Sequence, residues 1–218
     1  MPSTPERPAR IAALAITGAI TGLMLDTAAT AQPCRLLIFG DSLAAAWSAP
    51  PPAGWIQTIH GQPGGRATAI APALPALLQA QRPHAVLILA GSNDARAAAL
   101  WPWGDAVAQA QSAIAAMART GAASGAQLLV ARLAPLGRQG WWRQLLIGDR
   151  QSQAMQAIEA GLDLPAGTGR LDLPKLLAGP DGGIDSAFRI DHIHLNQAGY
   201  ARLAAGLRPL LAGHCPPG

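Results

Sequence analysis

Residues 35–43 read RLLIFGDSL, an apolar run that ends in glycine, aspartate and serine. Short apolar runs that stop at a glycine are typical of buried strands. Together with Arg35–Phe39, runs of this kind predict about five strands. The others are Trp55–Ile59, Ala85–Ala90, Gln127–Ala131 and Arg170–Leu173.

Helical patterns separate these strands. We expect helices at Ala67–Gln81, from an N-capping Asp105 to Thr120, at Asp149–Gly161 and after Asn196. The residues around Gly91–Asp94 and from Leu133 to about Gly148 are expected to be loops. Strands that alternate with helices predict a mostly parallel sheet covered on both faces. Ligands of such sheets bind beyond the carboxyl ends of the strands, so the loops at those ends are the candidates for a site.

The first 31 residues have the pattern of a signal peptide. Arg7 and Arg10 precede the apolar run Ile11–Leu25, and Ala29-Thr30-Ala31 offers a cleavage site. The run is shorter than the roughly 20 residues that span a membrane, although an uncleaved anchor is the alternative. We therefore expect residues 1–31 to be removed and residues 32–218 to form a periplasmic or secreted domain without a stable membrane span.

Composition limits the classes of partner. The net charge is +4, but no Lys/Arg run is interleaved with aromatic residues, so nucleic-acid binding is not expected. No cysteine pair has the spacing of a metal site, and no cofactor is expected. The two cysteines, Cys34 and Cys215, lie near the ends of the expected mature chain. Chain ends often lie close together, and exported proteins meet an oxidising compartment, so a disulfide is predicted, with two free thiols as the alternative.

Serine chemistry is indicated by Ser42, at the end of the first strand, and by DHIH at residues 191–194. A serine hydroxyl needs a neighbouring base to act as a nucleophile. The spacing of Asp191 and His194 lets the carboxylate orient the imidazole. Asp191, His192 and His194 could instead bind a metal. The hydrolase interpretation is preferred, because turns after the second and third strands, around Gly64 and Asn93, could stabilise an oxyanion.

Four blocks together resemble the GDSL family of hydrolases, also called SGNH hydrolases. The blocks are GDSL at 40–43, the turn around Gly64, GSND at 91–94 and DHIHLN at 191–196. The resemblance implies a three-layer α/β/α sandwich of the flavodoxin-like kind.

The same resemblance implies roles for individual residues. Ser42 would be the nucleophile, His194 the general base and Asp191 the residue that orients it. The Ser42 and Gly64 N–H groups and the Asn93 side chain would form the oxyanion hole, with the adjacent Gly65 as the other candidate glycine. Asp41 and Asp94 are expected to order their loops.

Tryptophan is common for a chain so poor in aromatic residues, with six Trp against two Phe and one Tyr. Five of them follow strand ends on the expected ligand side, in segments that resemble loops: Trp47, Trp101, Trp103, Trp141 and Trp142. Indoles stack on sugars or form the wall of an acyl pocket, and they also pack beneath loops. We expect Trp101, Trp141 and Trp142 to bind substrate.

The expected function is hydrolysis of a small-molecule or glycan ester, with short acyl esters of carbohydrates, such as acetyl esters, as the preferred class. A lipase or thioesterase, or an O-acyltransferase, would use the same triad. A non-catalytic envelope-binding protein is the alternative from another class.

Overall fold

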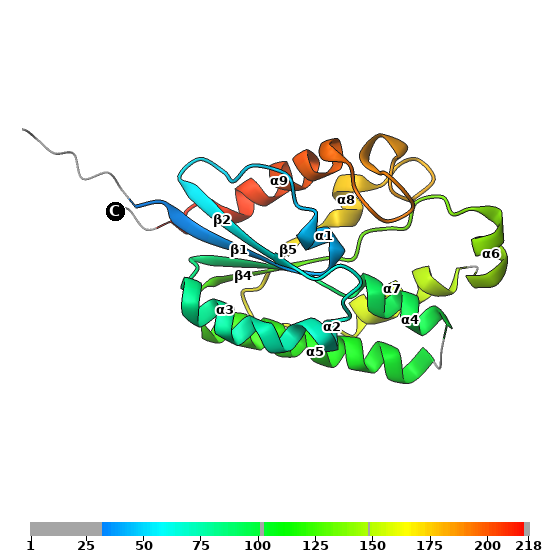
Figure 1. The fold of residues 1–218 in the computed structure, drawn as a ribbon, viewed down its shortest axis with the longest axis horizontal. Coiled ribbons are helices and arrows are strands. Elements are labelled where there is room, and N and C mark those ends of the chain that lie inside the picture. The colour runs from blue at the N-terminus through cyan, green and yellow to red at the C-terminus, as the bar shows by residue number, and fades with distance from the viewer. Residues whose placement is uncertain (1–31, 101–102, 148, 216–218) are drawn as a thin grey trace, which may run out of the picture. The chain divides into compact units, whose positions relative to one another are not determined.

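A computed structural model describes residues 32–100, 103–147 and 149–215. The predicted signal peptide therefore lies outside the described residues. The core is a five-stranded sheet in the order β2-β1-β3-β4-β5, and every neighbouring pair is parallel (Figure 1). The strands are β1 (Cys34–Gly40), β2 (Trp55–Gly61), β3 (Ala85–Leu89), β4 (Gln127–Ala131) and β5 (Gly169–Leu171). The predicted sheet is confirmed, with strand ends within two residues of those expected.

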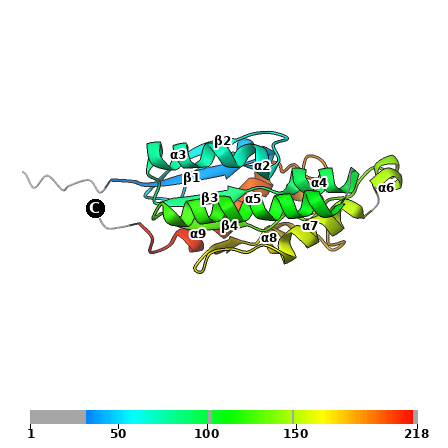
Figure 2. The ribbon, with the colours of Figure 1, turned by 90° about the horizontal axis from the view of Figure 1, so that it is seen from below.

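Helices cover both faces of this sheet, which gives the three layers that were expected. One layer contains α1 (Ser42–Ala45), α8 (Leu173–Leu177) and α9 (Gln197–Leu211), above the sheet in Figure 1. The other layer, seen from below in Figure 2, contains α2 (Ala67–Ile70), α3 (Leu74–Gln81), α4 (Ser92–Leu100), α5 (Trp103–Ala123) and α7 (Arg150–Ala160). Successive strand residues face opposite layers: Leu36 and Ile38 pack on the first, Leu37 and Phe39 on the second.

Several helix predictions need correction. The expected helix Ala67–Gln81 is divided into α2, a 3-10 turn (Ala71–Ala73) and α3, with a proline near the start of each of the last two segments. The helix expected from Asp105 to Thr120 is α5, which begins at Trp103, so Asp105 lies in its first turn and is not its cap. Two segments expected to be loops are helical, namely α4 and α6 (Trp141–Ile147).

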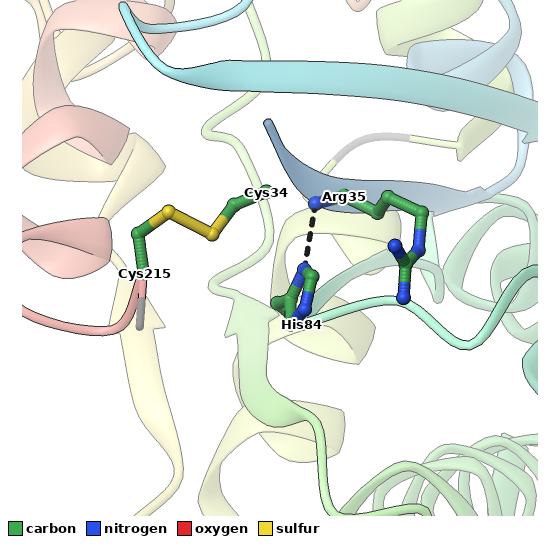
Figure 3. Close-up of a disulfide and its surroundings, with 4 residues drawn as sticks. All are labelled: Cys34, Arg35, His84 and Cys215. Carbon is green, nitrogen blue, oxygen red and sulfur yellow. Dashed lines mark hydrogen bonds between the residues drawn. A yellow bond between two sulfur atoms is a disulfide. The ribbon is translucent and has the colours of Figure 1, made fainter. Parts of the chain in front are cut away.

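The structure contains the Cys34–Cys215 disulfide, which joins the start of β1 to the segment after α9. Figure 3 shows His84 beside it, where the ring Nδ1 accepts the Arg35 N–H at 2.9 Å. The Arg35 guanidinium donates to the Arg82 carbonyl at the end of α3. The disulfide and these hydrogen bonds thus connect the segments at the amino-terminal end of the sheet, opposite the strand carboxyl ends. Within the described part of the chain, every helix is too short or too polar to cross a membrane.

Candidate active site

Ser42 stands where β1 gives way to α1. Gly40 before it has φ +157°, and a side chain there would collide with the Leu89 carbonyl of β3. Asp41 caps the short helix, because its Oδ1 accepts the Leu43 N–H at 2.9 Å. The Asp41 N–H donates to the Leu89 oxygen at 2.9 Å. The close approach of β3 therefore holds Ser42 at the carboxyl edge of the sheet.

His194 and Asp191 meet this serine from the loop before α9. The His194 Nε2 lies 3.2 Å from Ser42 Oγ, and the His194 Nδ1 lies 2.7 Å from Asp191 Oδ2. An anionic carboxylate at Nδ1 favours the tautomer with its proton there, which leaves the Nε2 lone pair facing the serine. The structure thus brings together three residues that are distant in sequence, in the order that nucleophile activation requires.

The Asp191 carboxylate accepts backbone hydrogen bonds in addition to its contact with the His194 ring. Its Oδ1 accepts the N–H groups of Ile193 at 2.8 Å and His194 at 2.7 Å. Partial burial acts to raise the pKa of Asp191, but the hydrogen bonds from the His194 ring and the two N–H groups lower it to about 2. Asp191 is consequently ionised at neutral pH and able to stabilise an imidazolium.

The metal-site alternative depends on His192 joining these two residues. His192 Nδ1 is 3.9 Å from Asp191 Oδ1. Among the described residues, no group of three His, Cys, Asp or Glu side chains is arranged to hold a metal ion. The Asp191 and His194 side chains are instead directed at each other.

Three hydrogen-bond donors follow the neighbouring strands β1, β2 and β3. In the described residues, the N–H groups of Ser42 and Gly64 have no acceptor. The Gly65 N–H, by contrast, donates to Gln62 O at 2.9 Å. Asn93 Nδ2 donates one hydrogen to Gly65 O at 3.1 Å, which leaves its second hydrogen free. This distribution favours Gly64 over Gly65 as the oxyanion glycine.

Asp94 fixes the turn that presents Gly64. Its carboxylate is buried and accepts the Ala67 N–H at 2.9 Å, so it links the first turn of α4 to the start of α2. Burial raises the pKa of Asp94, and the Ala67 N–H opposes that rise. Asp94 therefore orders the loop, as expected from the sequence.

Replacing Asn93 with alanine should lower kcat by roughly 10²-fold, about 3 kcal/mol, with a smaller change in KM, because an oxyanion exists only after attack on the carbonyl. Steady-state kinetics on p-nitrophenyl acetate measure the two constants, and the melting temperature controls for a loosened Gly64 turn. A variant altered in KM alone would contradict this role.

One carboxylate oxygen of Asp41 lacks a hydrogen-bond partner in the described structure. This atom, Oδ2, is buried beside a cavity of about 10 Å³ that Ser92 also lines. Burial raises the pKa of Asp41 to about 7. The hydrogen bond from the Leu43 N–H acts to lower this pKa, whereas the charge of Asp94 acts to raise it. The sequence indicated a role in ordering the loop, but it did not indicate this titration near neutral pH.

Asp41 should make stability depend on pH. Between about pH 4 and 7, the folded protein holds a proton that the unfolded chain has released, so the free energy of unfolding falls as pH rises through that window. Asp41→Asn keeps the capping oxygen and removes the titration. We expect urea unfolding at pH 5 to 8 to show a shallower pH dependence in the variant, and an unchanged slope would refute the assignment.

A cavity of about 560 Å³ opens beside the oxyanion donors, between α4 and α6. It is lined by Gly64, Arg66, Asn93, Arg96, Ala97, Leu100, Trp142, Leu146 and Ile147. Sequence reasoning missed the arginines and aliphatic residues, whose common location depends on α4 and α6 being helices. A larger cavity of about 890 Å³, between α7 and residues 181–183, is lined by none of Ser42, Gly64, Asn93 and His194.

The tryptophans separate into different roles. Trp142 lines the 560 Å³ cavity, whereas Trp141 does not. Trp47 is buried and packs edge-on against Tyr200, so it belongs to the core. Trp101 lies outside the described residues. Trp141 and Trp142 occupy the first turn of a helix and not a loop.

The order of the site residues along the chain and their geometry agree with a sequence comparison. The profile of the GDSL-like Lipase/Acylhydrolase family matches residues 38–202. The chain belongs to this family. It is therefore an ester hydrolase of the GDSL/SGNH type, a class that acts on small-molecule substrates. A search of curated protein sequences gave no match.

Solved structures show the same fold. A GDSL-like lipase from Bacteroides thetaiotaomicron has a TM-score of 0.64 at 20% identity, over 84% of this chain and 92% of that one. The acetyl xylan esterase AlAXEase has a TM-score of 0.63 at 15% identity, over 81% and 99%. A carbohydrate acetylesterase family member from Sinorhizobium meliloti has a TM-score of 0.59 at 15% identity, over 84% and 99%. At these identities the likeness establishes the fold alone.

Proposed function

We propose that this GDSL hydrolase cleaves esters through an acyl-Ser42 intermediate and that its substrates are short acyl esters of carbohydrates. The observation that carries the proposal is the continuous contact from Asp191 Oδ2 to His194 Nδ1, 2.7 Å, and from His194 Nε2 to Ser42 Oγ, 3.2 Å. The nucleophile, the base and the residue that orients the base are all within hydrogen-bond reach.

The chemistry follows from these contacts. Ser42 Oγ attacks the ester carbonyl while its proton passes to His194 Nε2, and Asp191 stabilises the resulting imidazolium. The tetrahedral oxyanion accepts hydrogen bonds from Ser42 N–H, Gly64 N–H and Asn93 Nδ2. His194 then protonates the leaving alcohol. Water, deprotonated by His194, attacks the acyl-serine; the carboxylic acid leaves and Ser42 recovers its proton.

The carbohydrate part of the proposal is supported by the cavity beside Asn93. Trp142 presents a half-exposed indole to it, and indole faces stack on sugar rings. Arg66 and Arg96 line the same space and can donate to sugar hydroxyls. Two similar folds carry the names acetyl xylan esterase and carbohydrate acetylesterase. We also propose that the domain is periplasmic or secreted, since the leader pattern and the disulfide suit an oxidising compartment.

A longer acyl chain is the second candidate, with a lipase or thioesterase as the enzyme class. The aliphatic side chains of Leu100, Leu146 and Ile147 line the cavity and could contact methylene groups. An O-acyltransferase would use the same triad, and adding an acceptor sugar would then yield a transfer product.

Trp142→Ala should lower kcat/KM for acetylated xylan or acetylated peptidoglycan fragments by roughly tenfold, and affect p-nitrophenyl acetate less, because only the glycan has a ring to stack. Trp141→Ala, one position away and outside the cavity, is the matched control. The wild-type enzyme is compared on p-nitrophenyl esters from acetate to palmitate. A clear preference for C12 or longer chains, with no acetate released from any glycan, would reject the carbohydrate assignment.

A further inference from the structure

The helix α6 exposes an apolar surface beside the cavity. Five of the eight large apolar side chains that are exposed in the described residues lie together here. We call this group the α6 surface: Leu100 at the end of α4 and Trp141, Trp142, Leu145 and Leu146 on α6, which are between 53% and 79% exposed. Contiguous apolar exposure of this kind marks an interaction site in soluble proteins.

The cavity accounts for only two of the four exposed apolar side chains on α6. Trp142 and Leu146 are one helical turn apart and both line the cavity. Trp141 and Leu145 form the neighbouring stripe, do not line the cavity, and are 79% and 78% exposed. A substrate seated in the cavity would leave that second stripe in water, so a different partner is needed to cover it.

The position of α6 suits contact with an extended surface. In both views α6 projects at the end of the domain toward which the strands run, away from the start of β1 and the end of α9 (Figures 1 and 2). A flat partner could therefore reach α6 without meeting the layers that cover the sheet. The same placement would bring the mouth of the cavity close to that partner.

Charge identifies the chemistry of the partner. Residues 138–150 contain three arginines and one aspartate, a net charge of 3 − 1 = +2. Arg138 and Arg150 flank α6 and are exposed, as are Arg66 and Arg96 in the adjoining cavity wall. Arginine beside tryptophan and leucine is the composition of helices that lie in the interface of anionic bilayers.

We propose that the α6 surface docks on an anionic phospholipid membrane, with Trp141 and Leu145 inserted at the headgroup level. Tryptophan is favoured at that depth, where its ring is apolar and its N–H stays wet. The arginines would contact lipid phosphates. This docking does not require catalysis, so it stands or fails separately from the proposed function.

The test is flotation with vesicles of phosphatidylcholine alone or mixed with phosphatidylglycerol, using the wild-type protein and Ser42→Ala. We expect both proteins to float with the mixed vesicles, and binding to weaken as salt is raised. Leu145→Glu should reduce binding by roughly tenfold or more and keep kcat/KM on soluble p-nitrophenyl acetate. Ile56→Glu is the matched control, since Ile56 is also an exposed apolar residue, on the edge strand β2, and its replacement should leave flotation unchanged.

Three outcomes would overturn the docking proposal: no flotation of the wild-type protein, equal flotation of Leu145→Glu, or a concentration-dependent dimer that Leu145→Glu abolishes. The last would assign the α6 surface to a second copy of the chain. A wild-type protein that floats but has no esterase activity would reject the proposed function and leave the docking intact.

Discussion

Alanine at Ser42 or at His194 is expected to lower kcat on p-nitrophenyl acetate by on the order of 10³-fold or more. Ser42 supplies the oxygen that becomes acylated, and His194 Nε2, 3.2 Å away, removes its proton. Asp191→Asn should be similarly severe, because an amide at Nδ1 favours the wrong imidazole tautomer. Initial rates of p-nitrophenol release, measured over a wide range of substrate concentration, give the loss in kcat.

A double variant provides a control for the triad prediction, because the effects of the two substitutions on kcat should not add. Ser42 and His194 act together in one step, so removing either residue already abolishes their shared contribution to kcat. The Ser42→Ala/His194→Ala double variant should therefore be about as slow as either single variant. Circular dichroism should show the fold intact in all three proteins. Wild-type activity in Ser42→Ala would remove the serine assignment, and activity lost on adding EDTA would indicate a metal mechanism instead.

The sheet could be predicted because its strands carry their signal locally. Residues of β1, β3 and β4 are buried on both faces, so they read as unbroken apolar runs. The candidate catalytic residues follow from position along the chain, since Ser42, Gly64 and Asn93 each come after a parallel strand, at one edge of the sheet. Asn196 also behaves as its type suggests, because its side chain accepts the Gly199 N–H and caps α9.

The elements that form the cavity beside Asn93 could not be predicted, because they depend on contacts between distant segments. GSND at 91–94 reads as a turn, yet α4 begins at Ser92, where Asp94 is held by the Ala67 N–H. Trp47 resembled a loop residue of the ligand side, but Tyr200, from the last helix, encloses it in the core. The cavity exists only where α4 and α6 meet, which no local pattern encodes.

Removing the disulfide is expected to lower stability strongly while leaving catalysis at 25 °C within about twofold. The bond joins residues 181 positions apart, for which loop entropy gives up to about 5 kcal/mol. A loss of 2–4 kcal/mol would lower Tm by roughly 5–15 °C in a domain of this size.

The activity should survive because the bond and the site are at opposite ends of β1. Cys34 begins that strand and Ser42 lies two positions after its last residue, Gly40, which places them roughly 20 Å apart. Arg35 and His84, drawn beside the bond in Figure 3, hold the start of β1 to the segment before β3 through hydrogen bonds that reduction does not break. The Cys34→Ala/Cys215→Ala variant and the wild-type protein in dithiothreitol should therefore show the same fall in Tm and the same retained kcat/KM. An unchanged Tm in both would show that the bond does not constrain the unfolded chain, and an equal loss of activity with Tm retained would place its effect at the catalytic edge.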